Sequence, residues 1–304
     1  MHAFQNPAAY HLALLELVLC HPPQVRPIHG PIPLPAMASA KVLVASSKVT
    51  LGETLASQIV EASREALSSR DVFVLALSGG SIPSLLGAVE CQFSSEGIDP
   101  RWGSWHVVLA DERCVPSTSP DSNFGSIKAN FTSSVPIPAD QVHGIDDFLT
   151  SESTSDIAAA YQDDVLKPLL ARSGGKIDCA VLGFGPDGHT CSLFPDHPLL
   201  KETARLVAPI DDSPKPPPSR ITLTFPVLNS MCRHVVFCGA GSSKCDIVHA
   251  VFESPTRTQL LEDGDPKCHR LGLRDPAPYP CGMVRPGNLI WIIDSDAACR
   301  LSTS

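Results

Sequence analysis

Short runs rich in apolar residues alternate with helix-forming segments along most of this chain. Such runs are typical of strands that are buried on both faces of a parallel sheet. They occur at 72–77, 105–110, 177–182, 221–225, 234–238 and 289–293. Helical periodicity is found at 50–69, after Ser81, at 153–172 and at 244–253. The alternation predicts an α/β fold, with a Rossmann-like, mostly parallel sheet and helices on both faces.

The patterning changes at about Met37. Residues 21–35 are rich in Pro and His, and the preceding segment lacks the basic start and cleavage site of a secretory signal. We therefore expect residues 1–36 to be a disordered or non-core extension and residues 37–304 to form a single α/β domain. Within that domain, Thr50 and Glu53 match a capping box and predict the start of the first helix.

Charge and cysteine usage exclude several classes of protein. The net charge of -9 argues against a nucleic-acid-binding protein. No apolar run is long enough to span a membrane. The 11 cysteines are scattered, with no C-x-x-C pair, so we expect free thiols in a reducing compartment, the cytoplasm, and no metal site.

Two of the strand ends carry candidate anion-binding groups. In a parallel sheet, ligands bind at the carboxyl ends of the strands. Gly79, Gly80 and Ser81 follow the run at 72–77 and form a turn with exposed backbone amides, which favours an anion, although a plain strand-to-helix turn explains the glycines too. Asp111 and Arg113 follow the run at 105–110. An arginine there can bind a phosphate through two N–H groups, although a solvated ion pair explains these charges equally well.

The other two strand ends offer a base and a further cation. Residues 183–188 read G-x-G-x-x-G, but Pro186 and Asp187 occupy the turn where a dinucleotide needs free amides, so we reject that interpretation. His189 follows in this loop, and imidazole is the natural general base near neutral pH. Lys244 lies at a helix start, where an anionic ligand would offset its unfavourable interaction with the helix dipole.

Four stretches carry a resemblance to the 6-phosphogluconolactonase family, within the glucosamine/galactosamine-6-phosphate isomerase superfamily. They read SGGS, ADERCVP with DSN downstream, GFGPDGHTCSLFPDHPLL and DSPKPPPSRITLTFPVLN. The resemblance spans residues 40–255 and resumes at 287–301. It implies the sugar-phosphate isomerase/deaminase-like fold, hydrolysis of 6-phospho-D-glucono-1,5-lactone in the oxidative pentose phosphate pathway, and no metal or organic cofactor.

The residues and the resemblance together suggest one mechanism for a carboxylic ester hydrolase. His189 would take a proton from the attacking water, and Asp187 would orient the imidazole. The substrate-binding set would comprise Gly79, Gly80, Ser81, Asp111, Arg113, Asn123, Arg220 and Lys244. Backbone amides of the glycine loop at 183–188 are candidates for stabilising the oxyanion.

Two alternatives stay open at this point. One is an amino-sugar-phosphate deaminase/isomerase, and the other is a non-catalytic sugar-phosphate sensor. In every case we expect a small sugar phosphate as ligand, no nucleic acid or membrane partner, and a monomer or weak homodimer. Residues 256–286 are longer and more irregular than the family pattern.

Overall fold

The computed structural model describes residues 38–252 and 259–301. The extension expected over residues 1–36 lies outside these ranges. Across the described ranges, none of the helices combines the length and apolar character needed to cross a bilayer.

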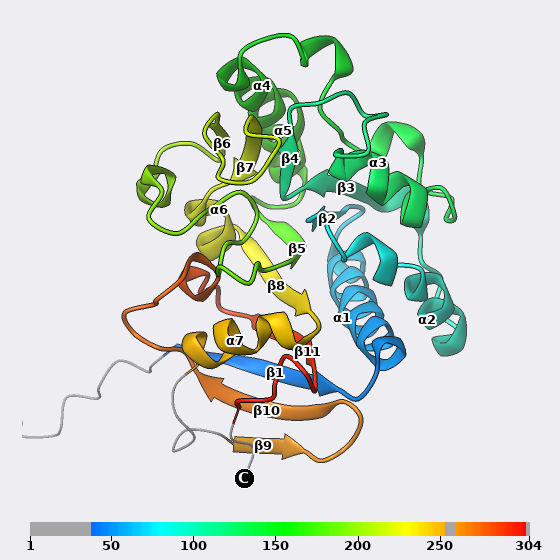
Figure 1. The fold of residues 1–304 in the computed structure, drawn as a ribbon. Helices are drawn as coiled ribbons and strands as arrows, with labels where there is room; N and C mark the ends of the chain where they lie inside the picture. Colours follow the sequence, from blue (N-terminus) through cyan, green and yellow to red (C-terminus); the bar gives the residue numbers. More distant parts are fainter. Residues whose placement is uncertain (1–37, 253–258, 302–304) are drawn as a thin grey trace, which may run out of the picture. The chain divides into compact units, whose positions relative to one another are not determined.

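A central eight-stranded sheet organises the domain (Figure 1). Its order is β3-β2-β5-β8-β11-β1-β10-β9. The first six of these strands run parallel, and β10 and β9 are antiparallel at one edge. The bounds are β1 (Ser39–Ala45), β2 (Phe73–Leu77), β3 (Trp105–Leu109), β5 (Ile177–Leu182), β8 (Cys232–Gly239), β9 (Gln259–Glu262), β10 (Lys267–Gly272) and β11 (Leu289–Asp294). The predicted mostly parallel α/β fold is confirmed.

A second, three-stranded antiparallel sheet lies beside the first. It consists of β4 (Asp111–Arg113), β7 (Arg220–Leu223) and β6 (Val207–Ile210), with β7 in the middle. The run at 221–225 was expected to contribute to the parallel sheet, and this is wrong. A short apolar run does not specify its partner strand, and here β7 pairs antiparallel with β4 and β6.

The longest helix, α1 (Lys48–Ser69), packs across five strands of the main sheet: β1, β2, β5, β8 and β11. Its N-cap is Ser47, whose Oγ accepts a 3.1 Å hydrogen bond from the Thr50 backbone N–H. The capping box expected at Thr50 is therefore wrong by one turn, because Ser47 already satisfies that amide.

The remaining helices are short. Their bounds are α2 (Ala88–Glu96), α3 (Asn123–Ile127), α4 (Thr154–Ala160), α5 (Lys167–Arg172), α6 (Phe225–Ser230) and α7 (Cys245–Val251). The helix predicted at 153–172 is present as α4, a π-helical stretch (Tyr161–Leu166) and α5. The helix expected directly after Ser81 is not: a 3₁₀ turn at Pro83–Leu85 intervenes, and α2 begins at Ala88.

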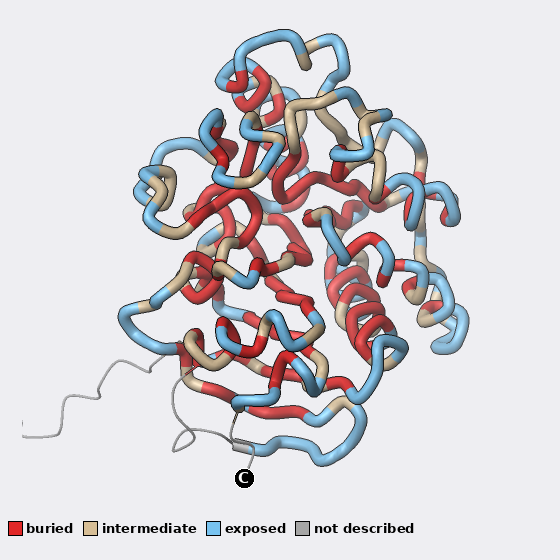
Figure 2. Tube along the Cα trace, viewed as in Figure 1, coloured by how far each residue is buried: buried red, intermediate tan, exposed pale blue. Residues whose placement is uncertain are grey.

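The core follows the parallel strands, which are almost entirely buried in Figure 2. Trp105 on β3 packs edge-on against Phe73 on β2, with ring centroids 4.6 Å apart. Near the other end of the parallel array, Trp291 on β11 packs against Phe237 on β8 at 4.5 Å. These aromatic contacts join neighbouring parallel strands through the core.

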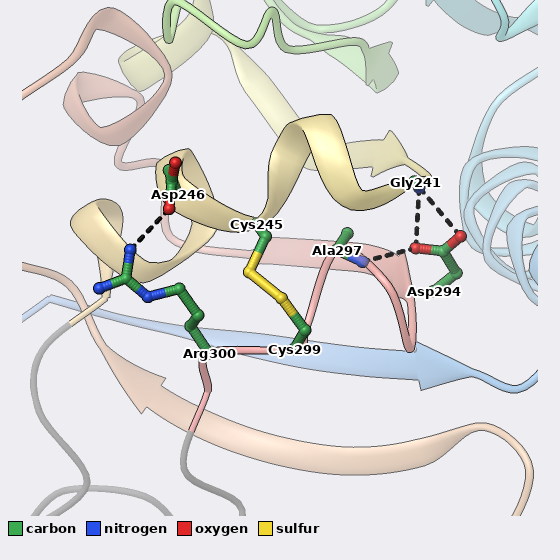
Figure 3. Close-up of a disulfide and its surroundings, with 7 residues drawn as sticks. All are labelled: Gly241, Cys245, Asp246, Asp294, Ala297, Cys299 and Arg300. Atoms are coloured by element: carbon green, nitrogen blue, oxygen red, sulfur yellow. Dashed lines mark hydrogen bonds and ion pairs between the residues drawn. A yellow bond between two sulfur atoms is a disulfide. The ribbon is translucent and has the colours of Figure 1, made fainter.

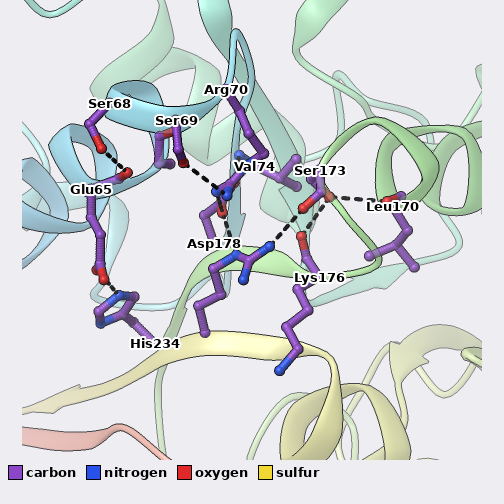
Figure 4. Close-up of polar contacts among 12 residues, drawn as sticks. Glu65, Ser68, Ser69, Arg70, Val74, Leu170, Ser173, Lys176, Asp178 and His234 are labelled. Carbon is purple, nitrogen blue, oxygen red and sulfur yellow. Dashed lines mark hydrogen bonds and ion pairs between the residues drawn. The ribbon is translucent and has the colours of Figure 1, made fainter.

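A buried charged cluster links the strands at their amino ends (Figure 4). Asp178, near the start of β5, is almost fully buried and forms ion pairs with Arg70 and Arg233. It also accepts a 2.9 Å hydrogen bond from the Val74 N–H at the start of β2. A buried carboxylate with this many partners holds the amino ends of neighbouring strands in register.

One disulfide departs from the expectation of free thiols (Figure 3). Cys245, the first residue of α7, is bonded to Cys299, 54 positions along the chain. Eight other cysteines within the described residues are free, and six of these are buried. Spacing along the chain did not reveal the pair, because only the fold places the segment after β11 against α7.

Candidate active site

The four strand-end segments meet at one cleft of about 220 Å³. It lies at the carboxyl ends of β2, β5 and β8 and is completed by the short second sheet. Every substrate-binding residue predicted from the sequence lines it, together with the predicted base. These residues are Gly79, Gly80, Ser81, Asp111, Arg113, Asn123, His189, Arg220 and Lys244. Asp187 is not among the lining residues and reaches the cleft only through His189.

His189 and Asp187 form a hydrogen-bonded pair, with Nδ1 of the imidazole 2.5 Å from Asp187 Oδ1. Burial raises the pKa of Asp187, but its hydrogen bonds to His189 and Lys215 outweigh this and lower the pKa to about 2. The carboxylate is therefore ionised and accepts the Nδ1 proton, which leaves Nε2 as the free basic nitrogen.

The imidazole is held in an environment that keeps it uncharged. It stacks on Phe194 with ring centroids 4.9 Å apart. Burial lowers the pKa of His189, and its contact with Asp187 only partly restores it. A neutral imidazole oriented by a carboxylate has the protonation state that a general base requires.

Gly185 makes room for this pair. A Cβ at that position would lie 2.0 Å from Nδ1 of His189 and 2.2 Å from Oδ1 of Asp187. The amides of Gly185 and Gly188 are both used inside the loop, donating to the carbonyls of His189 and Gly185 respectively. These two amides are therefore engaged and do not serve as the oxyanion donors that the loop was expected to offer.

Three cations face the cleft. Arg113 on β4 and Arg220 on β7 lie directly opposite each other in the antiparallel register. Like charges at opposed positions destabilise a strand pair unless something compensates them. Lys244, the last residue of the 3₁₀ turn Ser242–Lys244 and the N-cap of α7, donates to the Phe184 carbonyl and lies 5.2 Å from the Phe184 ring centroid. The arrangement is typical of an anion-binding site.

The two arginines differ in how much of each guanidinium is free. Arg220 is buried and donates through Nε and Nη2 to three carbonyls, those of Lys215, Pro216 and Pro217. Arg113 donates from Nη1 to the Asp121 carbonyl at 2.5 Å. Within the described residues, its buried Nε has no hydrogen-bond partner, and neither has the buried hydroxyl of Ser78, another residue that lines the cleft. Arg113 is thus the arginine with donors available to a ligand.

Glu112 holds the chain around Arg113 and Asn123 in place through hydrogen bonds. Its carboxylate is buried and accepts from the backbone N–H groups of Arg113, Asn123 and Phe124 and from the Ser122 hydroxyl. These four hydrogen bonds, which we call the latch, join β4 to the start of α3. The latch explains why an acidic residue lies between Asp111 and Arg113.

Asn123 is held beside the glycine turn by this latch. Its side-chain amide donates to the Asp111 carbonyl at 2.8 Å. A Cβ on Gly79 would lie 1.8 Å from the Asn123 Oδ1, so only glycine allows the turn and the asparagine to approach this closely.

Asp111 is buried at the cleft and accepts a 2.8 Å hydrogen bond from the Ser192 hydroxyl. Sequence reasoning missed Ser192, and it also missed Lys215, whose ammonium lies 2.9 Å from Asp187 Oδ2. Both residues fall inside the longest stretches that carried the family resemblance, which was the only signal available for them. Among the described residues there is no cluster of three or more His, Cys, Asp or Glu side chains arranged to hold a metal ion.

The fold and cleft together define an α/β protein in which cationic side chains lie beside a neutral imidazole at the carboxyl ends of parallel strands. The sequence profile described as "Glucosamine-6-phosphate isomerases/6-phosphogluconolactonase" matches residues 46–291. The chain belongs to this family.

Relatives and solved structures agree with that assignment. The chain is 38% identical to human 6-phosphogluconolactonase over 274 residues, covering 88% of this chain and 96% of the human protein. It is 34% identical to 6-phosphogluconolactonase 3, chloroplastic, of Arabidopsis thaliana, covering 81% and 71% respectively. The structure of 6-phosphogluconolactonase from Trypanosoma brucei superposes with a TM-score of 0.67 at 24% identity, covering 88% of this chain and all of that one (100%).

Proposed function

We propose that this protein hydrolyses 6-phospho-D-glucono-1,5-lactone to 6-phospho-D-gluconate, a step of the oxidative pentose phosphate pathway, as a carboxylic ester hydrolase. The observation that carries the proposal is the match to human 6-phosphogluconolactonase, which is 38% identical and aligned over 96% of its length. The cleft supplies what the reaction needs, a group of cations for the phosphate beside a neutral imidazole for the water.

The phosphate is the part of the substrate that the cations would bind. Arg113 would contribute the part of its guanidinium that lines the cleft, the turn at Gly79–Ser81 would contribute backbone amides, and Lys244 would contribute its ammonium. Arg220 has donor capacity left mainly at Nη1, since its other nitrogens are occupied. Asn123 completes the binding set at the glycine turn.

The lactone carbonyl would then lie near His189. Nε2 takes a proton from water as the water oxygen bonds to C1, and Asp187 stabilises the imidazolium that forms. The C1–O5 bond breaks as the tetrahedral intermediate collapses, and the imidazolium returns the proton to O5. The new carboxylic acid ionises, and repulsion from buried Asp111 would favour its release.

One assay tests this function. Lactone is generated freshly from glucose 6-phosphate, and its decay is followed with increasing amounts of the full-length chain. We expect a first-order rate that rises in proportion to protein concentration above the spontaneous hydrolysis. A rate equal to the spontaneous one at every concentration rejects the proposal. Ammonia release from glucosamine 6-phosphate, measured in parallel, would identify the deaminase alternative. Phosphogluconate binding without hydrolysis would identify the sensor.

The compartment and assembly belong to the same proposal. Eight of the ten cysteines in the described residues are free, which fits a reducing compartment such as the cytoplasm. A fluorescent fusion at the C-terminus, imaged beside a plastid marker, tests the location, because the Arabidopsis relative is named chloroplastic. Sedimentation of the purified chain tests the expected monomer or weak homodimer.

A further inference from the structure

Lys215 completes a three-membered cluster with the catalytic pair. Its Nζ lies 2.9 Å from Asp187 Oδ2 and 3.1 Å from His189 Nδ1. Asp187 therefore uses one oxygen for the imidazole and the other for the ammonium. The lysine comes from the proline-rich segment before β7, 26 positions away from His189 in the chain.

The backbone that carries Lys215 is built to hold it there. Its carbonyl accepts from Arg220 Nη2 at 2.9 Å and from the Ser213 hydroxyl at 2.9 Å. Its N–H donates back to the Ser213 hydroxyl at 3.3 Å. Arg220 also holds the carbonyls of Pro216 and Pro217. The buried guanidinium of Arg220 thus fixes the loop that carries Lys215.

Lys215 reaches the reaction only through its neighbours. His189 lines the cleft, whereas neither Asp187 nor Lys215 does. Because Nδ1 donates its proton to Asp187, it has no lone pair for the ammonium, and the 3.1 Å approach acts on the ring as a repulsive field.

The charged groups that face His189 are Asp187, Lys215 and Asp111. The two carboxylates favour the imidazolium, and the ammonium opposes it. Without Lys215, Asp187 would both orient the imidazole and hold a proton on it, so the base would be lost at mildly acidic pH. We infer that Lys215 is a positioning residue that fixes the Asp187 carboxylate and offsets its charge, so that His189 is oriented without being protonated. The inference rests on the proposed function.

The test uses the full chain with Lys215→Met, which removes the charge but keeps most of the aliphatic stem. We expect the acid limb of the kcat/KM profile to move up by about one pH unit, with KM for the lactone nearly unchanged above that limb. Lys215→Arg, which keeps the charge, should restore the parental limb. Lys201→Met, an exposed lysine changed in the same way, is the matched control and should behave like the parent.

A second measurement separates this inference from the proposed function. The titration of His189, followed by NMR of the ¹⁵N-labelled imidazole, needs no turnover and should move in Lys215→Met by the same amount as the acid limb. An unchanged titration overturns the inference even if the lactone is hydrolysed. A raised KM with an unmoved acid limb also overturns it, because Lys215 would then bind substrate directly. If Lys215→Met does not fold, Lys215→Gln is titrated in its place under the same criteria.

Discussion

At the scale of single residues, the site separates groups that meet the ligand from groups that shape it. Arg113 and Arg220 are directly opposed in the strand register, yet Arg220 gives most of its donors to the 215–217 loop, whereas Arg113 keeps a buried Nε without a partner among the described residues. Residue type alone would assign both to the phosphate. The hydrogen bonds give Arg220 an architectural role, and we therefore expect Arg113 to be the main phosphate ligand of the two.

Replacing Arg113 by Ala should therefore weaken recognition of the phosphate. A hydrogen bond to a charged group contributes about 1.5–3 kcal/mol, which corresponds to roughly 10- to 100-fold in KM. We expect KM for the phosphorylated lactone to rise by this factor, while kcat/KM for unphosphorylated gluconolactone stays the same. The exposed Arg64→Ala is the control. An unchanged ratio between the two substrates would show that Arg113 does not bind the phosphate.

Replacing His189 by Ala should remove the general base. The expected loss in kcat is roughly 10²- to 10⁴-fold. Because His189 packs on Phe194 at the rim of the cleft and carries none of the phosphate-binding groups, phosphogluconate should still bind with nearly parental affinity by calorimetry. Activity within a few-fold of the parent would remove His189 from the mechanism.

At the scale of elements, the sequence predicted where several strands end, but it did not predict the second sheet or the loop contacts that hold the site residues in place. The runs at 72–77, 105–110 and 177–182 predicted β2, β3 and β5 because a strand buried on both faces has a local signature. The parallel-sheet rule then placed the residues after each strand at one edge. These two steps brought the glycine turn, Asp111, Arg113 and His189 together, whereas Asn123 and Arg220 entered the predicted set with the family resemblance.

Other elements and contacts had no local signature. β10 reads Lys-Cys-His-Arg-Leu-Gly and contains no continuous apolar run, and the strand run at 221–225 did not reveal that β7 joins a separate sheet. Lys215 reaches Asp187 only because the proline-rich loop folds back over the 183–189 loop. Contacts of this kind depend on tertiary structure, so neither periodicity nor composition predicts them.

The latch between β4 and α3 gives a prediction at this scale. Glu112→Gln would place a side-chain NH₂ against backbone N–H donors that the carboxylate now satisfies. An unsatisfied buried donor costs about 1–3 kcal/mol, so urea denaturation should show a loss of that size. The exposed Glu61→Gln should show none.

The same change should also reach the substrate. Asn123 is held beside Gly79 by this latch, so KM for the phosphorylated lactone should rise together with the loss of stability. A destabilised variant with unchanged KM would mean that the latch supports the fold but not the binding site.

At the scale of the whole molecule, charged side chains gather at both ends of the parallel strands. Asp178 and its two arginines hold the amino ends of the strands, and the cleft occupies the carboxyl ends. A further polar cluster lies at the amino end of β3, where His106 pairs in register with Val74. His106 on β3 is buried, with Nδ1 3.1 Å from His143 Nε2, and Arg172 lies 3.1 Å from His106 Nε2. An arginine can only donate, so this geometry requires a neutral His106.

This histidine pair should make the protein sensitive to acid. Burial, together with the nearby Arg172 and His143, lowers the pKa of His106 to about 4. In the unfolded chain its pKa returns to about 6.5. Between these values the unfolded state binds a proton that the folded state does not, so the free energy of unfolding falls as the pH drops from about 6.5 towards 4. His143, whose pKa burial also lowers, adds to the effect in the same direction.

The expected loss attributable to His106 is of the order of 1–3 kcal/mol between pH 7.5 and pH 4.5. Urea denaturation of the parent and of His106→Asn at these two values measures it. The variant should be less stable than the parent at pH 7.5, where its hydrogen bonds are missed, but should lose less stability on acidification. His249→Asn, on α7 and away from the pair, should follow the parent at both values. Equal pH dependence in the parent and in His106→Asn would show that the buried pair does not control acid unfolding, and that a carboxylate with a lowered pKa, such as Asp187, accounts for it instead.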